Sequence, residues 1–194
     1  MWQGSPVAWK EITNLKVTAC MIAKEARAIE ELHRHPQIIR LIAICPRPLG
    51  FMMELMPLGS AEDYFLKNFN SKCTVAQMVQ ILLDVSAALQ YVHSLGYVHR
   101  DIASRNLLLT ADLRAKLTDF GMCRYKVFLE CQRWQDTNKA FGAVHAGKPL
   151  PLKWCSPETL KDVGKFSEAG DIWSFGICAW ELLSRRPPYA DVDE

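Results

Sequence analysis

The sequence lacks any strong excess of charge. Across 194 residues, 23 Lys and Arg stand against 21 Asp and Glu, which leaves a formal net charge of only +2. Binding to nucleic acid through phosphate neutralisation needs a basic surplus, so this balance argues against that class of protein. The composition of disordered proteins is also absent, because hydrophobic residues make up 49% and charged residues 23% of the chain. These values are typical of a globular protein with a buried core.

Long apolar runs are absent as well. No run approaches the roughly 18 residues that a membrane-spanning helix needs, and residues 1–6 have neither the charged nor the apolar region of a signal peptide. We therefore expect a soluble protein. The cysteines are odd in number and form no Cys-x-x-Cys pair, which indicates reduced thiols in an intracellular compartment. They are Cys20, Cys45, Cys73, Cys123, Cys131, Cys155 and Cys178.

The pattern of the chain changes near residue 57. Before it, short β-like runs surround a single helix predicted at about 18–34; from about residue 60 onward the pattern is mostly helical. Pro57 and Gly59 punctuate the chain at this joint. The sequence therefore predicts an α+β protein with a small β-containing part and a larger helical part. The β-like runs are 7–10, 38–44 and 51–56.

Two long helices are predicted in the second part. Thr74 and Gln77 have the spacing of a capping box, and apolar residues then keep helical spacing until Gly96, which favours a helix end. The other helix, at about 167–183, is apolar nearly all round. We expect protein to surround it, as around the central helix of a domain.

Oxygen-bearing side chains flank a predicted β-hairpin. Its strands are 107–109 and 115–117, and folding it about its midpoint pairs Asn106 with Asp119 at the open end. Asp101 lies five residues before Asn106. Two oxygen ligands suit Mg²⁺, which usually takes further oxygens from water and phosphate. The alternative is that these residues only cap turns, as Asp and Asn often do.

Glu25 lies on the apolar stripe of the first predicted helix. Ile22, Ile29 and Leu32 share its face, so its carboxylate is expected to be buried and to need a partner. Lys10, inside the β-like run 7–10, is the obvious candidate. The alternative is a half-exposed Glu25 and a lysine that extends into solvent.

Several of these segments together resemble the protein kinases. His-Arg-Asp-Ile-Ala-Ser-Arg-Asn at 99–106 is similar to the kinase catalytic loop, and Asp-Phe-Gly at 119–121 to the metal-binding motif. Val-Ala-Trp-Lys at 7–10 matches the strand that carries the phosphate-binding lysine, and Glu25 stands at the position of its helical partner. The later landmarks follow in order, with Trp-Cys-Ser-Pro-Glu at 154–158 and Asp-Ile-Trp-Ser-Phe-Gly at 171–176.

The resemblance is to the tyrosine kinases within that superfamily. Ala103 stands where serine/threonine kinases usually carry a lysine, and Arg105 follows two residues later, as in the tyrosine kinases. Pro-Leu-Lys-Trp at 151–154 resembles the segment that shapes their tyrosine-substrate site. The segment Gly-Lys-Pro-Leu-Pro-Leu-Lys-Trp at 147–154 is also similar, more weakly, to the cytoplasmic Syk-like branch.

The resemblance implies a two-lobed kinase fold and phosphoryl transfer from ATP to tyrosine hydroxyls of protein substrates in intracellular signalling. Residues 1–57 would be the remnant of a small β lobe, and residues 58–194 a helical large lobe that reaches just past its central helix. The implied cofactors are ATP and Mg²⁺. The expected location is the cytoplasm or the cytoplasmic portion of a membrane receptor, with no partner nucleic acid and no membrane span in this chain.

The resemblance also assigns roles residue by residue. Asp101 would orient the phenol and accept its proton, with Arg105 near the transferred group. Lys10, held by Glu25, would bind the α- and β-phosphates. The remaining implied contacts are Mg²⁺ at Asn106 and Asp119, and the adenine at Ala8, Met53, Glu54, Leu55, Met56 and Leu108, with Met53 as gatekeeper and the backbone of 54–56 reading the adenine edge.

The sequence departs from the family pattern in three places. The family's first two strands and glycine-rich loop would precede Met1, and its last helices would follow residues 188–191, so we expect a transcript that extends at both ends. The segment between Asp119 and Glu158 is long, and its only tyrosine is Tyr125; Thr137 is a possible substitute for the usual mid-loop tyrosine. The alternative function is therefore a catalytically inactive kinase-like binding module or a non-functional fragment. We expect weak or no turnover from residues 1–194 alone.

Overall fold

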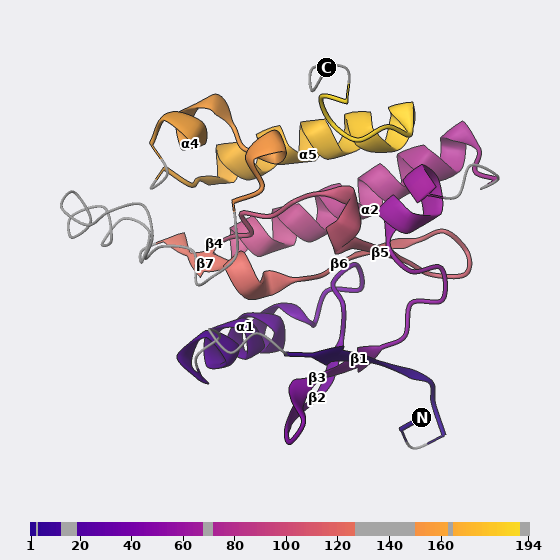
Figure 1. Ribbon diagram of the computed structural model, residues 1–194, viewed down its shortest axis with the longest axis vertical. Helices are drawn as coiled ribbons and strands as arrows, with labels where there is room; N and C mark the ends of the chain where they lie inside the picture. The colour runs from indigo at the N-terminus through magenta and orange to yellow at the C-terminus, as the bar shows by residue number, and fades with distance from the viewer. Residues whose placement is uncertain (3, 13–18, 68–71, 127–149, 163–164, 191–194) are drawn as a thin grey trace.

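The computed structural model describes residues 1–2, 4–12, 19–67, 72–126, 150–162 and 165–190. They form a mixed α and β fold of two parts that lie one above the other along the long axis (Figure 1). A small sheet with helix α1 makes one end, helix α5 makes the other, and helix α2 lies between them. This arrangement agrees with the α+β, two-lobed class that the sequence predicts.

The small sheet has three antiparallel strands in the order β1-β3-β2. They are β1 (Val7–Glu11), β2 (Leu41–Pro46) and β3 (Leu49–Glu54). The run predicted at 38–44 starts three residues late as a strand because Ile38 pairs elsewhere, forming a bridge with Leu117. Ile38 and Ile39 are buried there, so this short stretch ties the sheet to the helical part.

Helix α1 (Ala19–Leu32) lies against the sheet. Its buried stripe contains Ile22, Ile29 and Leu32, as the sequence predicts. Helix α1 also contacts the 3-10 turn η3 (Phe120–Met122), which belongs to the other part of the molecule. The helix therefore touches both parts, which matters for the residue that it carries at position 25.

Helix α2 (Val75–Ser94) runs through the centre of the helical part. The predicted capping box is present: Gln77 N donates to Thr74 Oγ1 at 3.2 Å, and Thr74 N donates to Gln77 Oε1 at 2.8 Å. Among the described residues, α2 is the one helix long and apolar enough to cross a membrane. Its residues Ile81, Val85 and Leu89 lie in the core, and core helices pass the same test of length and composition.

The β-hairpin forms as predicted, with β5 (Leu107–Leu109) antiparallel to β6 (Ala115–Leu117), but its register differs by one residue. Leu107 lies opposite Leu117, so Asn106 faces Thr118, and Asp119 is one position beyond. Thr110 N donates to Arg114 O at 3.0 Å, which closes a loop with an odd number of residues. The midpoint prediction assumed an even loop and was wrong for that reason.

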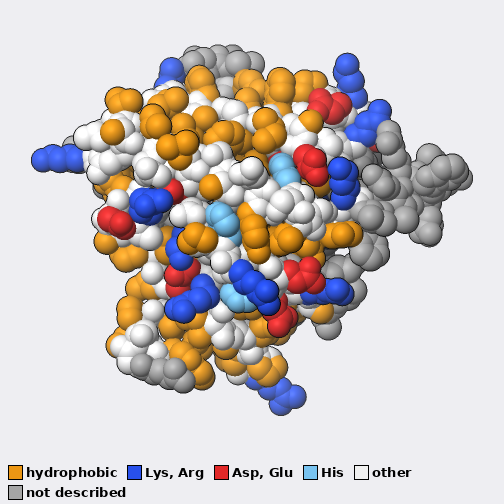
Figure 2. Space-filling model, turned by 180° about the vertical axis from the view of Figure 1, so that it is seen from behind, with side chains coloured by type: hydrophobic (Ala, Val, Ile, Leu, Met, Phe, Trp, Pro, Cys, Tyr) orange, Lys and Arg blue, Asp and Glu red, His pale blue; other side chains and the backbone are white. Residues whose placement is uncertain are grey.

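Helix α5 (Glu168–Ser184) has only one buried face. The prediction that protein surrounds it is wrong for the described residues, because Ile172, Trp173, Trp180 and Leu183 are exposed. Figure 2 shows apolar side chains gathered along this end of the molecule. An apolar composition indicates which residues can be buried, but it does not supply the neighbours that would bury them.

Short elements complete the fold. Strands β4 (Tyr97–Val98) and β7 (Arg124–Tyr125) pair with each other after α2. Helix α4 (Pro157–Lys161) precedes α5, and its N-cap Ser156 accepts from Thr159 N. The single turns are the π-turn η1 (Asp63–Lys67) and the 3-10 turns η2 (Ser104–Asn106) and η5 (Leu152–Trp154).

Candidate active site

Lys10 joins three elements at the boundary between the two parts. Its Nζ donates to Glu25 Oε1 at 2.8 Å and to Asp119 Oδ1 at 3.0 Å. The Glu25 side chain is only 12% exposed, and that of Lys10 is 34% exposed. The predicted pairing of Lys10 with Glu25 is therefore confirmed, and the alternative of a lysine extended into solvent is not what the structure has.

The electrostatics of Lys10 favour its charged form. Burial by itself lowers the pKa of the ammonium group, but the carboxylates of Asp119 and Glu25 raise that pKa, and the net direction is upward. Lys10 thus stays cationic at neutral pH. The ammonium group can donate to phosphate oxygens, and the two carboxylates beside it leave a local negative charge that a divalent cation would offset.

The loop that carries Asp101 is buried and internally bonded. Asn106 Nδ2 donates to the backbone oxygen of Asp101 at 2.8 Å, and both residues are less than a tenth exposed. The guanidinium of Arg105 forms an ion pair with Asp101 Oδ1. The structure therefore brings Asp101, Arg105 and Asn106 together, as the sequence predicts.

Asp119 follows β6 in a left-handed backbone conformation, with φ 58°. This geometry lets Gly121 N donate back to Asp119 Oδ1 at 3.4 Å. The next residue, Phe120, is fully buried and packs edge-on against His99, with 5.0 Å between ring centroids. The Asp-Phe-Gly turn is thus fastened to the loop that carries Asp101.

Asn106 and Asp119 offer a donor set that fits Mg²⁺. Because the Asn106 amide nitrogen is bonded to Asp101 O, its oxygen is the atom left to accept or to ligate. Among the described residues no group of three or more His, Cys, Asp and Glu could hold a metal ion. A site with one carboxylate and one amide oxygen suits Mg²⁺, which completes its shell with water and phosphate oxygens.

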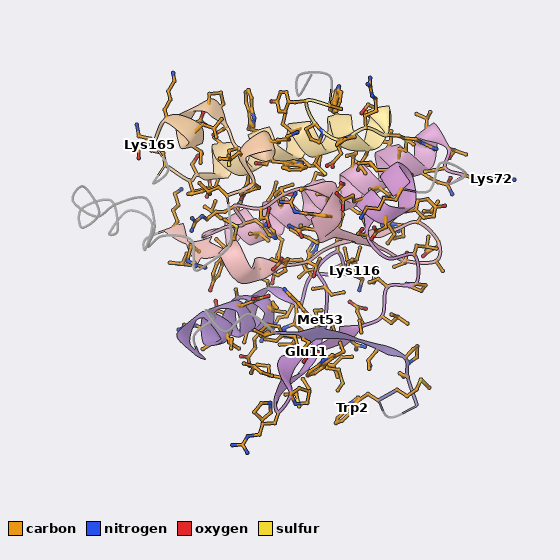
Figure 3. All side chains as sticks on the ribbon, in the orientation of Figure 1. Trp2, Glu11, Met53, Lys72, Lys116 and Lys165 are labelled. Atoms are coloured by element: carbon orange, nitrogen blue, oxygen red, sulfur yellow. The ribbon has the colours of Figure 1, made fainter. Side chains whose placement is uncertain are left out.

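The residues predicted around the adenine lie where the sheet faces the β5–β6 hairpin. Ala8 of β1 pairs with Met53 of β3, and Met53 is buried. Figure 3 shows Met53 on the side of the small sheet and Lys116 on the side of the β5–β6 hairpin. Leu108 of β5 bridges to Ser60, just after the segment that joins the two parts.

The segment that joins the two parts of the molecule begins at Glu54, whose side chain has two hydrogen-bond partners. Glu54 Oε1 accepts from Lys116 Nζ at 2.7 Å and from Arg40 N at 2.8 Å. Glu54 N donates to Arg40 O at 3.1 Å, so the backbone group that Glu54 can offer a ligand is its carbonyl. Leu55 is exposed and Met56 is buried.

Helix α5 anchors the loop that carries Asp101, which sequence reasoning missed. Asp171, 2% exposed, accepts from His99 N and Arg100 N at 2.8 Å each, and His93 Nε2 lies 2.9 Å from it. Glu181 accepts from Ser104 N at 3.1 Å. The signal was present in the sequence as acidic residues on an apolar helix, which must find partners if they are buried.

Arg100 and Tyr125 lie close to the start of the long segment after Asp119. The guanidinium of Arg100 is buried over the ring of Phe166, 3.9 Å from its centroid. Burial, helped by the charge of Arg124, lowers the pKa of Arg100 to about 10. Tyr125 lies in β7 with its ring edge-on to Tyr97, while Thr137 lies outside the described residues.

Comparison with known proteins places this geometry in context. A family model described as protein tyrosine and serine/threonine kinase matches residues 3–194. Human tyrosine-protein kinase FRK is 33% identical over 201 residues, which cover 99% of this chain and 38% of FRK. Ephrin type-B receptor 3 of Xenopus laevis is 38% identical over 161 residues, 81% of this chain and 16% of the receptor. Ephrin type-B receptor 1 of Gallus gallus is 37% identical over 161 residues, 81% of this chain and 15% of the receptor. The chain thus spans well under half the length of each of these relatives.

Proposed function

Since the chain belongs to the protein tyrosine and serine/threonine kinase family, we propose that it transfers the γ-phosphoryl group of ATP to tyrosine hydroxyls of protein substrates. The observation that carries this proposal is the contact between Lys10 and Asp119. These residues are 109 positions apart in sequence, yet Lys10 Nζ lies 3.0 Å from Asp119 Oδ1 and also pairs with Glu25. We propose that the protein acts in signalling in the cytoplasm or as the cytoplasmic portion of a receptor.

We assign the phosphate side of the site to residues of β1 and of the turn after β6. Lys10 binds the phosphates, and Glu25 holds the ammonium group in place. Asp119 and Asn106 would hold Mg²⁺. Bound MgATP supplies the phosphoryl group and a cation that neutralises its charge. The boundary between residues 1–57 and 58–194 is proposed to divide the two lobes between which the nucleotide lies.

The acceptor side belongs to the loop at 99–106. Asp101 would orient the tyrosine hydroxyl and accept its proton while the phenol oxygen bonds to the γ-phosphorus, the bond from that phosphorus to the β-phosphate oxygen breaks, and ADP leaves. Arg105, paired with Asp101, adds positive charge close to the transferred group. The adenine is enclosed by Ala8, Met53 and Leu108, and its edge meets the Glu54 carbonyl and the backbone of Leu55 and Met56.

The surroundings of Asp101 support tyrosine as the acceptor. The Arg105 guanidinium forms an ion pair with Asp101 and stacks over the ring of Trp154, 4.4 Å from the ring centroid. Position 103, where serine/threonine kinases usually carry a lysine, is a buried alanine. Arg105 and Trp154 therefore border the approach to the Asp101 carboxylate. A tyrosine carries its hydroxyl at the end of a long ring, so it can reach this carboxylate more readily than the short side chain of serine can.

A kinase-like binding module without turnover is the second candidate. The observation that favours it is the exposed apolar face of α5, which contains Ile172, Trp173, Trp180 and Leu183. Apolar surfaces of this kind mark interaction sites and also lower solubility. Such a face is compatible with a protein that binds a partner without chemistry.

A phosphotransfer assay separates the two candidates. The purified chain is incubated for hours with MgATP and either a tyrosine peptide or the same peptide with serine in its place, and phosphorylated product is quantified by mass spectrometry. We expect slow transfer to tyrosine alone, lost in Asp101→Asn and without Mg²⁺. Transfer to serine would contradict the tyrosine assignment. No transfer together with no binding of MgATP would favour the second candidate.

A further inference from the structure

One face of α5 carries polar side chains that are almost completely buried. Asp171, Ser174 and Glu181 stand at positions i, i+3 and i+10, and each is less than a tenth exposed. Helical spacing places them on one side of the helix. Buried polar groups need hydrogen-bond partners, and each of these side chains bonds to a group on another element.

Two of these residues bind Trp154, one at its backbone oxygen and one at its indole nitrogen. Ser174 Oγ donates to the backbone oxygen of Trp154 at 2.7 Å, and Trp154 Nε1 donates to Glu181 Oε2 at 3.2 Å. The same carboxylate oxygen accepts from Ser104 N at 3.1 Å. Glu181, 1% exposed, therefore links the turn η5 to the loop that carries Asp101.

The indole of Trp154, fixed in this way, also contacts Arg105. Its ring lies under the Arg105 guanidinium, 4.4 Å from the centroid, and Arg105 is paired with Asp101. An indole that donates its N–H to a carboxylate has a more electron-rich face, which strengthens its attraction for a cation. The contacts thus run from the Glu181 carboxylate through the electron-rich indole ring to the Arg105 cation and then to the Asp101 carboxylate.

We propose that Glu181 is a positioning residue for the acceptor side of the site, which through Trp154 holds the Arg105 guanidinium against Asp101. The proposal rests on the proposed kinase function for its effect on catalysis, but the positioning itself is a property of these three side chains. Lys10 and Asp119 lie on β1 and at the turn after β6, where Lys10 bonds to Glu25 and Asp119. Loss of Glu181 therefore affects the tyrosine acceptor and leaves nucleotide binding intact.

Variants at position 181 test the positioning directly. Protein labelled with ¹⁵N at tryptophan and arginine reports the Trp154 indole N–H and the Arg105 Nε–H by NMR, with Trp154→Phe and Arg105→Lys as assignment controls. We expect Glu181→Leu to shift both resonances. Glu181→Gln keeps an oxygen that can accept both hydrogen bonds but removes the charge, so it should shift both resonances less than Glu181→Leu does. Glu168→Leu, in the first turn of the same helix and with a side chain 39% exposed, is the matched control and should shift neither.

The kinetic readout separates positioning from general damage. We expect Glu181→Leu to raise KM for a tyrosine peptide, or the Kd if turnover is slow, about tenfold, with an unchanged thermal shift by MgATP. The double variant Glu181→Leu/Trp154→Phe should be no worse than Glu181→Leu alone, because both changes break one chain of contacts.

Three results would overturn the proposal. An unmoved Arg105 resonance in Glu181→Leu would show that Trp154 does not transmit the constraint. A loss of the MgATP shift equal to the loss of peptide binding would indicate a general structural role. Additive effects in the double variant would show that the two residues act separately. If the unaltered protein transfers no phosphate, the proposed function fails, while the resonances still decide whether Glu181 positions Arg105.

Discussion

Lys10 and Asp119 are in direct contact although a long stretch of sequence separates them. The 3.0 Å ion pair closes the space between the small sheet and the turn after β6, and Glu25 of α1 completes it at 2.8 Å. Three elements therefore meet at one ammonium group. The contact is the structural basis for the proposed phosphate site.

Replacing Lys10 should abolish the phosphate site with little loss of stability. In Lys10→Met we expect phosphotransfer to fall by roughly 100-fold or more, since a fixed charge that stabilises the transition state is lost. The ion pair is about a third exposed, so solvent screening keeps its contribution to stability small. Activity and thermal unfolding of the same samples check both expectations. Lys67→Met, which removes a surface lysine paired with Asp63, is the control; an equal loss of activity there would contradict the assignment.

Asp84 is expected to be a costly carboxylate to remove from the helical part. It is 3% exposed and accepts from Arg114 Nε at 2.8 Å, Arg114 Nη2 at 2.6 Å, Ala115 N at 3.0 Å and Gln80 Nε2 at 3.0 Å. Asp84→Ala leaves these donors without an acceptor between α2 and β6. We expect the free energy of unfolding in urea to fall by about 2–3 kcal/mol, because Arg114 is 45% exposed and stays hydrated while the buried Ala115 N loses its acceptor. A fall below about 1 kcal/mol would show that water replaces the carboxylate.

Sequence reasoning succeeded where the signal is local. The capping box at Thr74, the hairpin strands and the position of Glu25 on a buried stripe each depend on spacing within a few residues. These features reflect the fixed periods of helices and strands. The hairpin register was missed by one residue because loop length depends on the left-handed conformation of Leu113, which leucine rarely adopts.

Long-range anchors could not be located in the same way. Asp171 bonds to the backbone of His99 and Arg100, more than 70 residues away, and no periodicity indicates which loop it reaches. The exposed face of α5 was missed for a related reason. Its apolar residues satisfy the pattern of a central helix whether or not neighbours cover them.

The described cysteines should differ sharply in reactivity. Cys45, Cys73, Cys123, Cys155 and Cys178 are all free thiols. Burial raises the pKa of Cys123 and Cys178 well above the ordinary range, so their thiolates are scarce and shielded. Of these five thiols, we expect a thiol reagent under native conditions to label Cys45 first and to label Cys123 and Cys178 only on unfolding. Peptide mapping by mass spectrometry measures the order; rapid native labelling of Cys123 would contradict its burial.

The charge on Glu181 should lower stability at neutral pH. Burial raises the pKa of its carboxyl group, and the hydrogen bonds from Ser104 and Trp154 only partly oppose the shift. The folded state then binds a proton more tightly than the unfolded state, so stability falls as the pH rises from 4.5 through the folded pKa. Glu181→Gln should remove this slope and leave the free energy of unfolding at pH 7 no lower. Urea unfolding from pH 4.5 to 8 checks it; a steeper slope in the variant would reverse the sign.

Thermal unfolding with and without MgATP tests the central claim most directly, because a ligand that binds only the folded state must raise the Tm. We expect a higher Tm with MgATP than with ATP or Mg²⁺ alone, and the gain should disappear in Asp119→Asn and after chelation of the metal. This outcome would show that Lys10, Asn106 and Asp119 form a working metal and nucleotide site. A cooperative transition whose Tm does not respond to MgATP would contradict it.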